Sequence, residues 1–202
     1  KANLLLTTGN GKKGTIMKNN YFFAVKIPEE QKMQLYSFIY EKRNDYPFKN
    51  WVHPLDYHIT LAFLGKVAPI LLRESVRRVQ HHLSGEKSFQ LTFRQLGVFG
   101  AKTSPRVFWA DVFPSEDLTN IHEKVYQACL EAGAQLDQRP FRPHITLARK
   151  WIGEHPFSEH LLLPVEQKDG TPISFKVQEI VLYESNLTST PKYQEIERFS
   201  LL

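Results

Sequence analysis

The pentapeptide His-Ile-Thr-Leu-Ala stands at His58–Ala62 and recurs at His144–Ala148, once in each half of the chain. Ile, Thr and Leu suit a pleated, half-buried surface, so each copy predicts a short strand. Side chains alternate between the two faces of a strand, which places His and Thr on one face and Ile and Leu on the other. One face of each strand therefore presents an imidazole beside a hydroxyl, and the other presents aliphatic groups to a core. A pseudo-symmetric fold would bring both polar pairs into one cleft.

The segments around the two copies predict an α+β fold. Further strands are expected at residues 21–27, 89–98, 106–112, 174–176, 179–183 and 195–200, and helices at 28–43, 71–82, 116–132 and, less regularly, 158–163. Ser115 is suited to cap the third helix and Gly133 to end it. Residues 46–55, rich in proline and aromatic side chains, are expected to form a connection. Tight turns between neighbouring strands favour antiparallel sheets.

Length and composition predict one domain in a reducing compartment. The chain has 202 residues, enough for a sizeable core, and no apolar run of the roughly 18 residues that span a bilayer. Cys129 is the only cysteine, which excludes an intrachain disulfide and favours the cytoplasm. We interpret residues 1–16 as an expression remnant or a flexible extension ahead of Met17, and residues 17–202 as the folded domain.

Positive charge gathers around the second copy. The formal net charge is +5, and three lysines of the 1–16 segment contribute to it, so the remaining chain is only slightly basic. Between residues 139 and 150, however, there are four cations and no acid. This cluster predicts an anionic ligand near His144.

Two histidines that face each other across a cleft suit paired acid–base catalysis. One neutral imidazole can deprotonate an attacking water while the second, protonated, gives a proton to a leaving oxygen. The hydroxyls of Thr60 and Thr146 can donate to phosphate oxygens and hold the group in line. A metal site is the rival interpretation, but zinc prefers three or four ligands, and each copy offers one His with a poorly ligating Thr. We therefore expect neither a metal nor a cofactor.

The residues that follow the two copies differ. Arg149 comes three positions after Thr146 and can bind the same phosphate through its guanidinium. Phe63 holds the matching position after Thr60, where it is either an aromatic surface for a nucleobase or a residue of the core. We expect one half of the site to handle charge and the other to offer an aromatic face.

The paired motifs resemble those of the two-histidine (2H) phosphoesterase superfamily, in particular the bacterial LigT-like RNA 2′,3′-cyclic phosphodiesterases. The resemblance rests on two H-x-[ST]-x motifs and their surroundings: residues 58–61, 144–147, 63–65, 105–109, Pro143 and Arg149. It implies a bilobal, pseudo-two-fold α+β fold of two antiparallel sheets, with helices packed outside and a central cleft. It also implies metal-independent hydrolysis of a 2′,3′-cyclic phosphate to a 2′-phosphate, with His58 as proton donor and His144 as proton acceptor.

The resemblance implies RNA as the substrate, because a 2′,3′-cyclic phosphate requires a ribose 2′ oxygen. RNA 3′ ends or short oligonucleotides are expected rather than long duplexes, since the charge outside the cleft is modest. Some relatives join RNA through 2′–5′ bonds in the reverse reaction, so reversible ligation stays open. We expect a monomer. Two alternatives also stay open: a non-catalytic module that binds nucleotides or RNA ends in the same cleft, and a purely structural domain.

Overall fold

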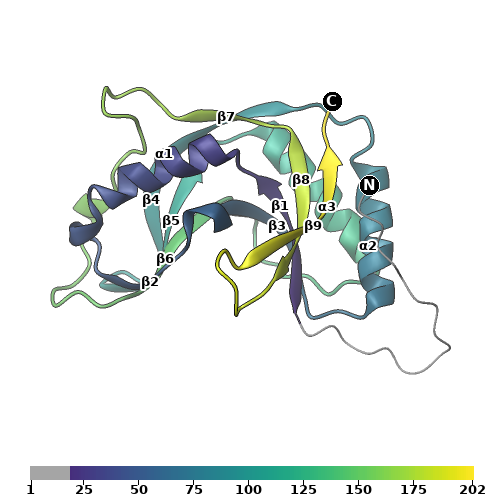
Figure 1. Ribbon diagram of the computed structural model, residues 1–202, viewed down its shortest axis with the longest axis horizontal. Coiled ribbons are helices and arrows are strands. Elements are labelled where there is room, and N and C mark those ends of the chain that lie inside the picture. Colours follow the sequence, from purple (N-terminus) through teal and green to yellow (C-terminus); the bar gives the residue numbers. More distant parts are fainter. Residues whose placement is uncertain (1–18) are drawn as a thin grey trace.

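The computed structural model describes residues 19–202, and its strands form two antiparallel sheets (Figure 1). The first sheet has the order β3-β1-β8-β9, with β3 at His58–Gly65, β1 at Asn20–Lys26, β8 at Glu179–Ser185 and β9 at Tyr193–Ser200. The second has the order β2-β6-β5-β4-β7, with β2 at Phe48–Trp51, β6 at Ile145–Trp151, β5 at Ser104–Val112, β4 at Phe89–Ala101 and β7 at Ser174–Val177.

The two sheets repeat one plan. The order β3-β1-β8-β9 in the first corresponds to β6-β5-β4-β7 in the second. Each series begins with a pentapeptide strand: β3 starts at His58, and β6 starts at Ile145, one residue after His144. Strand β2 is an addition outside β6. The expected α+β class with two antiparallel sheets and pseudo-two-fold symmetry is therefore confirmed.

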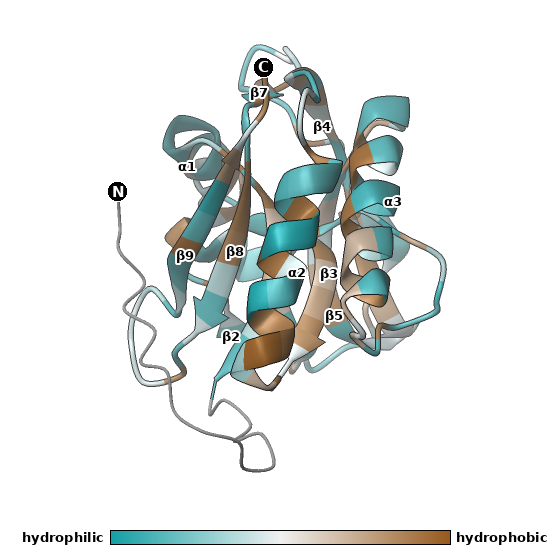
Figure 2. Ribbon diagram, turned by 90° about the vertical axis from the view of Figure 1, so that its right-hand side faces the viewer, coloured by the Kyte–Doolittle hydropathy of each residue, from teal (hydrophilic) through white to brown (hydrophobic). Residues whose placement is uncertain are grey.

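Within residues 19–202, three α-helices accompany the sheets: α1 at Glu29–Tyr40, α2 at Pro69–His82 and α3 at Glu116–Glu131. Helix α3 is capped as predicted, because the Ser115 hydroxyl accepts a hydrogen bond from the Leu118 amide at 3.1 Å, and Gly133 follows its end with φ +94°. Helices α2 and α3 contact each other, and Figure 2 shows hydrophobic β3 between them. Helix α1 lies toward the second sheet (Figure 1).

The expectation of a plain connection over residues 46–55 is wrong. This segment contains β2, which pairs antiparallel with β6 and places Asn50 opposite Arg149. Phe48, the first residue of β2, is buried in the core. A strand of four residues next to Pro47 carries too short an alternation to be recognised, so its pairing with β6 decides the conformation. A 3₁₀ turn at Pro54–Asp56 then leads into β3.

Other boundaries shift by a few residues. Helix α1 ends at Tyr40, three residues before the predicted end at Arg43, and a 3₁₀ turn follows at Arg43–Asp45. The irregular helix expected near residues 158–163 is a 3₁₀ turn at Glu159–Leu161. Strands β4 and β5 run further than expected, so the loop between them is a tight hairpin turn.

A large hydrophobic cluster joins one face of each sheet to the three helices. It includes Phe23 and Ile59 from the first sheet and Phe108 and Leu147 from the second, all at most 1% exposed. The aliphatic residues of both pentapeptides therefore face the core, as their alternation predicted. No helix within residues 19–202 is long and apolar enough to cross a membrane. The interpretation of residues 1–16 lies outside the described residues.

Candidate active site

Both motif strands contain a β-bulge at the same place. Pairing of β3 with β1 skips Leu61, and pairing of β6 with β5 skips Leu147, each the residue after the motif threonine. Both leucines and the alanines that follow them are buried. An extra residue bends a strand and re-aims the side chain that follows. The next residues, Phe63 and Arg149, are accordingly exposed at matching positions.

The two imidazoles are anchored in the same way. His58 Nδ1 lies 2.6 Å from the carbonyl oxygen of Asp56, and His144 Nδ1 lies 2.7 Å from that of Arg142. A carbonyl oxygen can only accept, so Nδ1 carries the proton in each neutral ring and Nε2 keeps the lone pair. Each histidine thus bonds the carbonyl two residues before it and leaves Nε2 for proton transfer.

The two motif threonines have different partners. Thr60 Oγ1 lies 3.1 Å from His58 Nε2 and donates to it while that ring is neutral. The Thr146 hydroxyl makes no hydrogen bond to another residue of the described range 19–202, and its side chain is half-buried. Both hydroxyls can turn toward a ligand oxygen, Thr60 by giving up its bond to His58.

Burial keeps both histidines neutral near pH 7. Desolvation lowers the pKa of His58 to about 4 and outweighs the hydrogen bond to the Asp56 carbonyl, which raises this pKa; the Lys32 charge lowers it further. The pKa of His144 is also lowered, mainly by desolvation, with the Arg149 charge adding to it. A neutral imidazole can act as a base. To act as a proton donor, an imidazole in this environment needs a bound anion that raises its pKa and so restores its proton.

Aromatic rings pack against both imidazoles. The His58 ring centroid lies 4.8 Å from that of Phe22 and 5.1 Å from that of Tyr193. His144 stands edge-on to Phe99 at 5.0 Å. Such walls fix the orientation of each ring and limit its access to water, which explains the desolvation.

Asp56 connects His58 to the approach to β9. Its two carboxylate oxygens accept hydrogen bonds from the backbone amides of Lys192 and Tyr193, both at 3.0 Å, and the side chain is buried. Its backbone carbonyl accepts from His58 Nδ1. Behind this turn, the buried Lys32 ammonium donates to the Leu55 carbonyl at 2.7 Å. One residue therefore positions both the imidazole and the tyrosine that packs against it.

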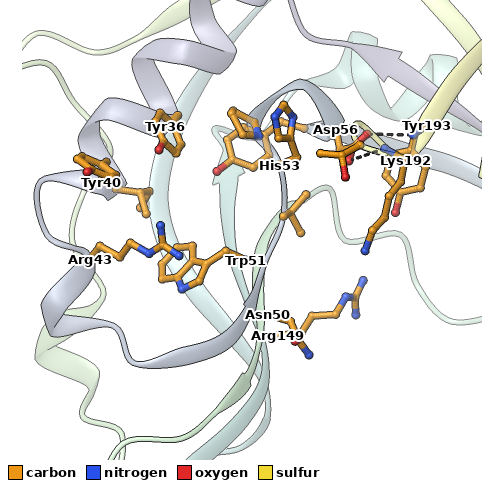
Figure 3. Close-up of a pocket in the computed structure, with 15 residues that line it drawn as sticks. Tyr36, Tyr40, Arg43, Asn50, Trp51, His53, Asp56, Arg149, Lys192 and Tyr193 are labelled. Carbon is orange, nitrogen blue, oxygen red and sulfur yellow. Dashed lines mark hydrogen bonds between the residues drawn. The ribbon is translucent and has the colours of Figure 1, made fainter. Parts of the chain in front are cut away.

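Two hollows adjoin the motif strands. The first, which we call the Trp51 hollow, has a volume of about 400 Å³, and its walls include Tyr36, Tyr40, Arg43, Trp51, His53, Arg149, Lys192 and Tyr193 (Figure 3). The second, the His144 hollow, has a volume of about 920 Å³, and its walls include Phe99, Trp109, Phe141, Arg142 and His144. The predicted site residues Arg149 and His144 thus open into separate hollows.

The alternative that placed Phe63 in the core is wrong. Its side chain is 54% exposed, and its ring stacks 6.4 Å from Phe22, the residue that packs on His58. The bulge explains the exposure, because the preceding two residues take the inward positions. A contact of Phe63 with a nucleobase stays a prediction. Within residues 19–202, no three His, Cys, Asp or Glu side chains gather as a metal cluster would require.

Sequence reasoning missed several residues of the Trp51 hollow. Tyr36, Tyr40 and Arg43 follow one another at spacings of four and three, which places them on one side of a helix and its C-terminal turn. That stripe of aromatic and cationic residues was a usable signal. Lys192 and Tyr193 gave no such signal, because hydrogen bonds to the distant Asp56 and the pairing of β9 with β8 bring them to the site.

Comparison with known proteins gives consistent matches. The sequence model of the 2′-5′ RNA ligase superfamily matches residues 31–188. A Geobacillus stearothermophilus protein named RNA 2′,3′-cyclic phosphodiesterase is 42% identical over 92% of this chain, which spans 58% of that protein's length. The Bacillus subtilis protein of the same name is 36% identical over 92% of this chain and 98% of its own. The crystal structure of E. coli LigT complexed with 3′-AMP has a TM-score of 0.75 at 24% identity, covering 91% of this chain and 98% of that one.

Proposed function

The chain belongs to the 2′-5′ RNA ligase superfamily, and on this premise we propose that it is an RNA 2′,3′-cyclic phosphodiesterase that leaves a 2′-phosphate. The observation that carries the proposal is the matched anchoring of His58 and His144. Each imidazole has Nδ1 fixed by a backbone carbonyl and Nε2 left for proton transfer. Two such groups on one chain suit a reaction that must remove one proton and deliver another.

In the proposed reaction a water attacks the phosphorus of the cyclic phosphate. His144 Nε2 takes a proton from this water as the new P–O bond forms. The P–O3′ bond breaks, and His58 Nε2–H gives its proton to the departing 3′ oxygen. The products are a 2′-phosphate and a 3′-hydroxyl, and the two histidines exchange their protonation states. This assignment of roles follows the family resemblance, since the Nδ1 hydrogen bonds of the two rings are alike and do not distinguish acid from base.

The phosphate itself completes the proton donor. A cyclic phosphate diester carries a negative charge, and such a charge next to a buried imidazole raises its pKa. Binding would therefore restore to His58 the proton that burial removes in the free protein. Thr60 would then turn its hydroxyl from His58 to a phosphate oxygen, with Thr146 donating from the other strand. Arg149 would bind the same phosphate and stabilise the charge that develops on it.

Substitution of each histidine tests this proposal. His58→Ala and His144→Ala should each lower kcat for a 2′,3′-cyclic nucleotide by about 10² or more, the usual contribution of a general acid or base. His160→Ala, an exposed histidine outside both hollows, is the matched control and should keep full activity. Full activity in either motif variant would contradict the mechanism. Tight nucleotide binding without turnover by the unmodified protein would instead favour the non-catalytic module.

We also propose that the protein works as a monomer in the cytoplasm. Both histidines come from one chain, so the acid–base pair needs no second copy, and light scattering should report a mass near 23.5 kDa.

Reverse ligation forming a 2′–5′ bond is a further proposal. The His144 hollow beside the proposed base has room for the nucleoside whose 5′-hydroxyl would replace water. Ligation of a cyclic-phosphate end to a 5′-hydroxyl RNA would test it.

A further inference from the structure

The Trp51 hollow has two ends of different character. Figure 3 shows Arg149 and Lys192 at one end and Arg43 beside Trp51 at the other. The first end belongs to the proposed reaction site, because Tyr193 there packs against His58 and the Arg149 charge acts on His144. The far end has no part in the proposed proton transfers, so its side chains need another explanation.

The charge of the hollow favours an anion. Its walls carry three cations, Arg43, Arg149 and Lys192, and none of them forms an ion pair with a carboxylate within residues 19–202. Among the wall residues that the structure describes, Asp56 is the only acid, and both its oxygens already accept hydrogen bonds from backbone amides. Cations without local partners in a concave site attract a ligand of opposite charge.

The far end is aromatic. Tyr36 and Tyr40 lie with ring centroids 5.5 Å apart, and the Arg43 guanidinium lies 4.9 Å from the centroid of the Trp51 ring. Tyr40 is 57% exposed although it is a large aromatic residue. Exposed rings next to unpaired cations are the means by which proteins hold single-stranded nucleic acid, with bases stacked on the rings and phosphates on the cations.

The structure of a cyclic-phosphate end determines which nucleotide can reach the far end of the Trp51 hollow. The terminal nucleoside of the substrate has both its 2′ and 3′ oxygens in the cyclic phosphate, so further RNA can continue only from its 5′ side. The hollow's volume of about 400 Å³ lies within the range of sites for small ligands and suits about one nucleotide. A strand whose cyclic phosphate lies between the histidines would therefore place its next nucleotide along this hollow.

We propose that the Trp51 hollow binds the nucleotide immediately 5′ of the cyclic-phosphate end. Its base stacks on the rings of Tyr36, Tyr40 and Trp51, Arg43 adds a cationic face, and Lys192 contacts the phosphodiester that joins the two nucleotides. This inference rests on the proposed phosphodiesterase function. It makes oligonucleotides, rather than mononucleotides, the preferred substrates.

The test compares a nucleoside 2′,3′-cyclic phosphate with a dinucleotide that ends in the same cyclic nucleotide. Stacking of one base contributes about 1–3 kcal/mol, so kcat/KM should be about tenfold or more higher for the dinucleotide. Tyr40→Ala and Arg43→Gln should each lower this ratio several-fold. Both side chains are exposed, so folding should not be affected. Arg73→Gln, an exposed arginine on α2 that is not part of the hollow, is the matched control and should keep the ratio.

Three results would overturn the inference. A ratio near one in the unmodified protein shows that the second nucleotide gains no contact. An unchanged ratio in both hollow variants places that contact elsewhere. An equal loss on both substrates assigns the hollow to the terminal nucleotide instead. In all three cases the cyclic nucleotide is still hydrolysed, whereas absence of any hydrolysis refutes the proposed function itself.

Discussion

Replacing Asp56 with asparagine perturbs the connection between His58 and β9 without changing the size of the side chain. In the native protein the two carboxylate oxygens accept the amides of Lys192 and Tyr193, both at 3.0 Å, within a buried site. Asparagine keeps one acceptor and turns the other into an NH₂ donor. The variant therefore sets a donor against a backbone donor and leaves that amide unpaired.

The magnitude follows from these two bonds. A hydrogen bond to a charged group contributes about 1.5–3 kcal/mol net, and an unpaired buried donor costs about 1–3 kcal/mol. We expect Asp56→Asn to lose about 3 kcal/mol of unfolding free energy. For a chain of this size, each kcal/mol lowers the melting temperature by about 2–4 °C, so the shift should be about 9 °C. Because Tyr193 packs on His58, kcat/KM should also fall at temperatures where the variant is folded.

Thermal unfolding followed by circular dichroism, with activity measured well below the transition, tests this reasoning. Asp169→Asn is the matched control, because the Asp169 carboxylate also accepts two hydrogen bonds, from the Thr171 amide and hydroxyl, but lies at an exposed turn. Its melting temperature should shift by much less. A shift for Asp56→Asn no larger than that of the control would refute the role assigned to Asp56.

Three further predictions concern the site. The pKa of His58 in the folded protein, about 4, lies below its ordinary value of 6.5, so the unfolded chain binds this proton first as the pH falls. In urea titrations the native protein should therefore lose about 1 kcal/mol more unfolding free energy than His58→Gln between pH 7.5 and pH 5.5. Equal losses in the two proteins would contradict the lowered pKa. Because a bound phosphate raises the pKa of the proton donor, the alkaline limb of kcat should lie at higher pH than that of kcat/KM, and coincident limbs would argue against it. Arg149→Gln should lower kcat/KM about 10- to 100-fold even on a mononucleotide, because a charged contact with the phosphate is lost. Phe63→Ala, at the matching position, should lower kcat/KM less. A larger loss for Phe63→Ala would contradict the assignment of the phosphate contact to Arg149.

The repeated pentapeptide predicted much of the fold because alternation is a local property. Ile59 and Leu147 are buried as the pattern required, and the strands that carry them occupy matching places in two antiparallel sheets. The bulges after Thr60 and Thr146 could not be predicted, since they depend on the register of the neighbouring strands. They explain why Phe63 and Arg149 are both exposed.

The rest of the site depends on contacts between distant segments. Strand β2 forms because β6 offers a partner, and it brings Trp51 to the same hollow as Arg149. Lys192 and Tyr193 enter the site through hydrogen bonds to Asp56, more than 130 positions earlier in the chain. No local sequence pattern predicts a hydrogen bond between segments so far apart. The lowered pKa of His58 likewise follows from burial, which the motif alone does not indicate.

The decisive measurement is the separation of the products formed when a 2′,3′-cyclic nucleotide is incubated with the protein and excess EDTA. We expect metal-independent conversion to the 2′-phosphate alone, because the proposed proton donor protonates the 3′ oxygen as it leaves. We also expect that neither His58→Ala nor His144→Ala gives appreciable product under the same conditions. Formation of the 3′-phosphate, or loss of turnover on chelation, would contradict a two-histidine mechanism with these roles.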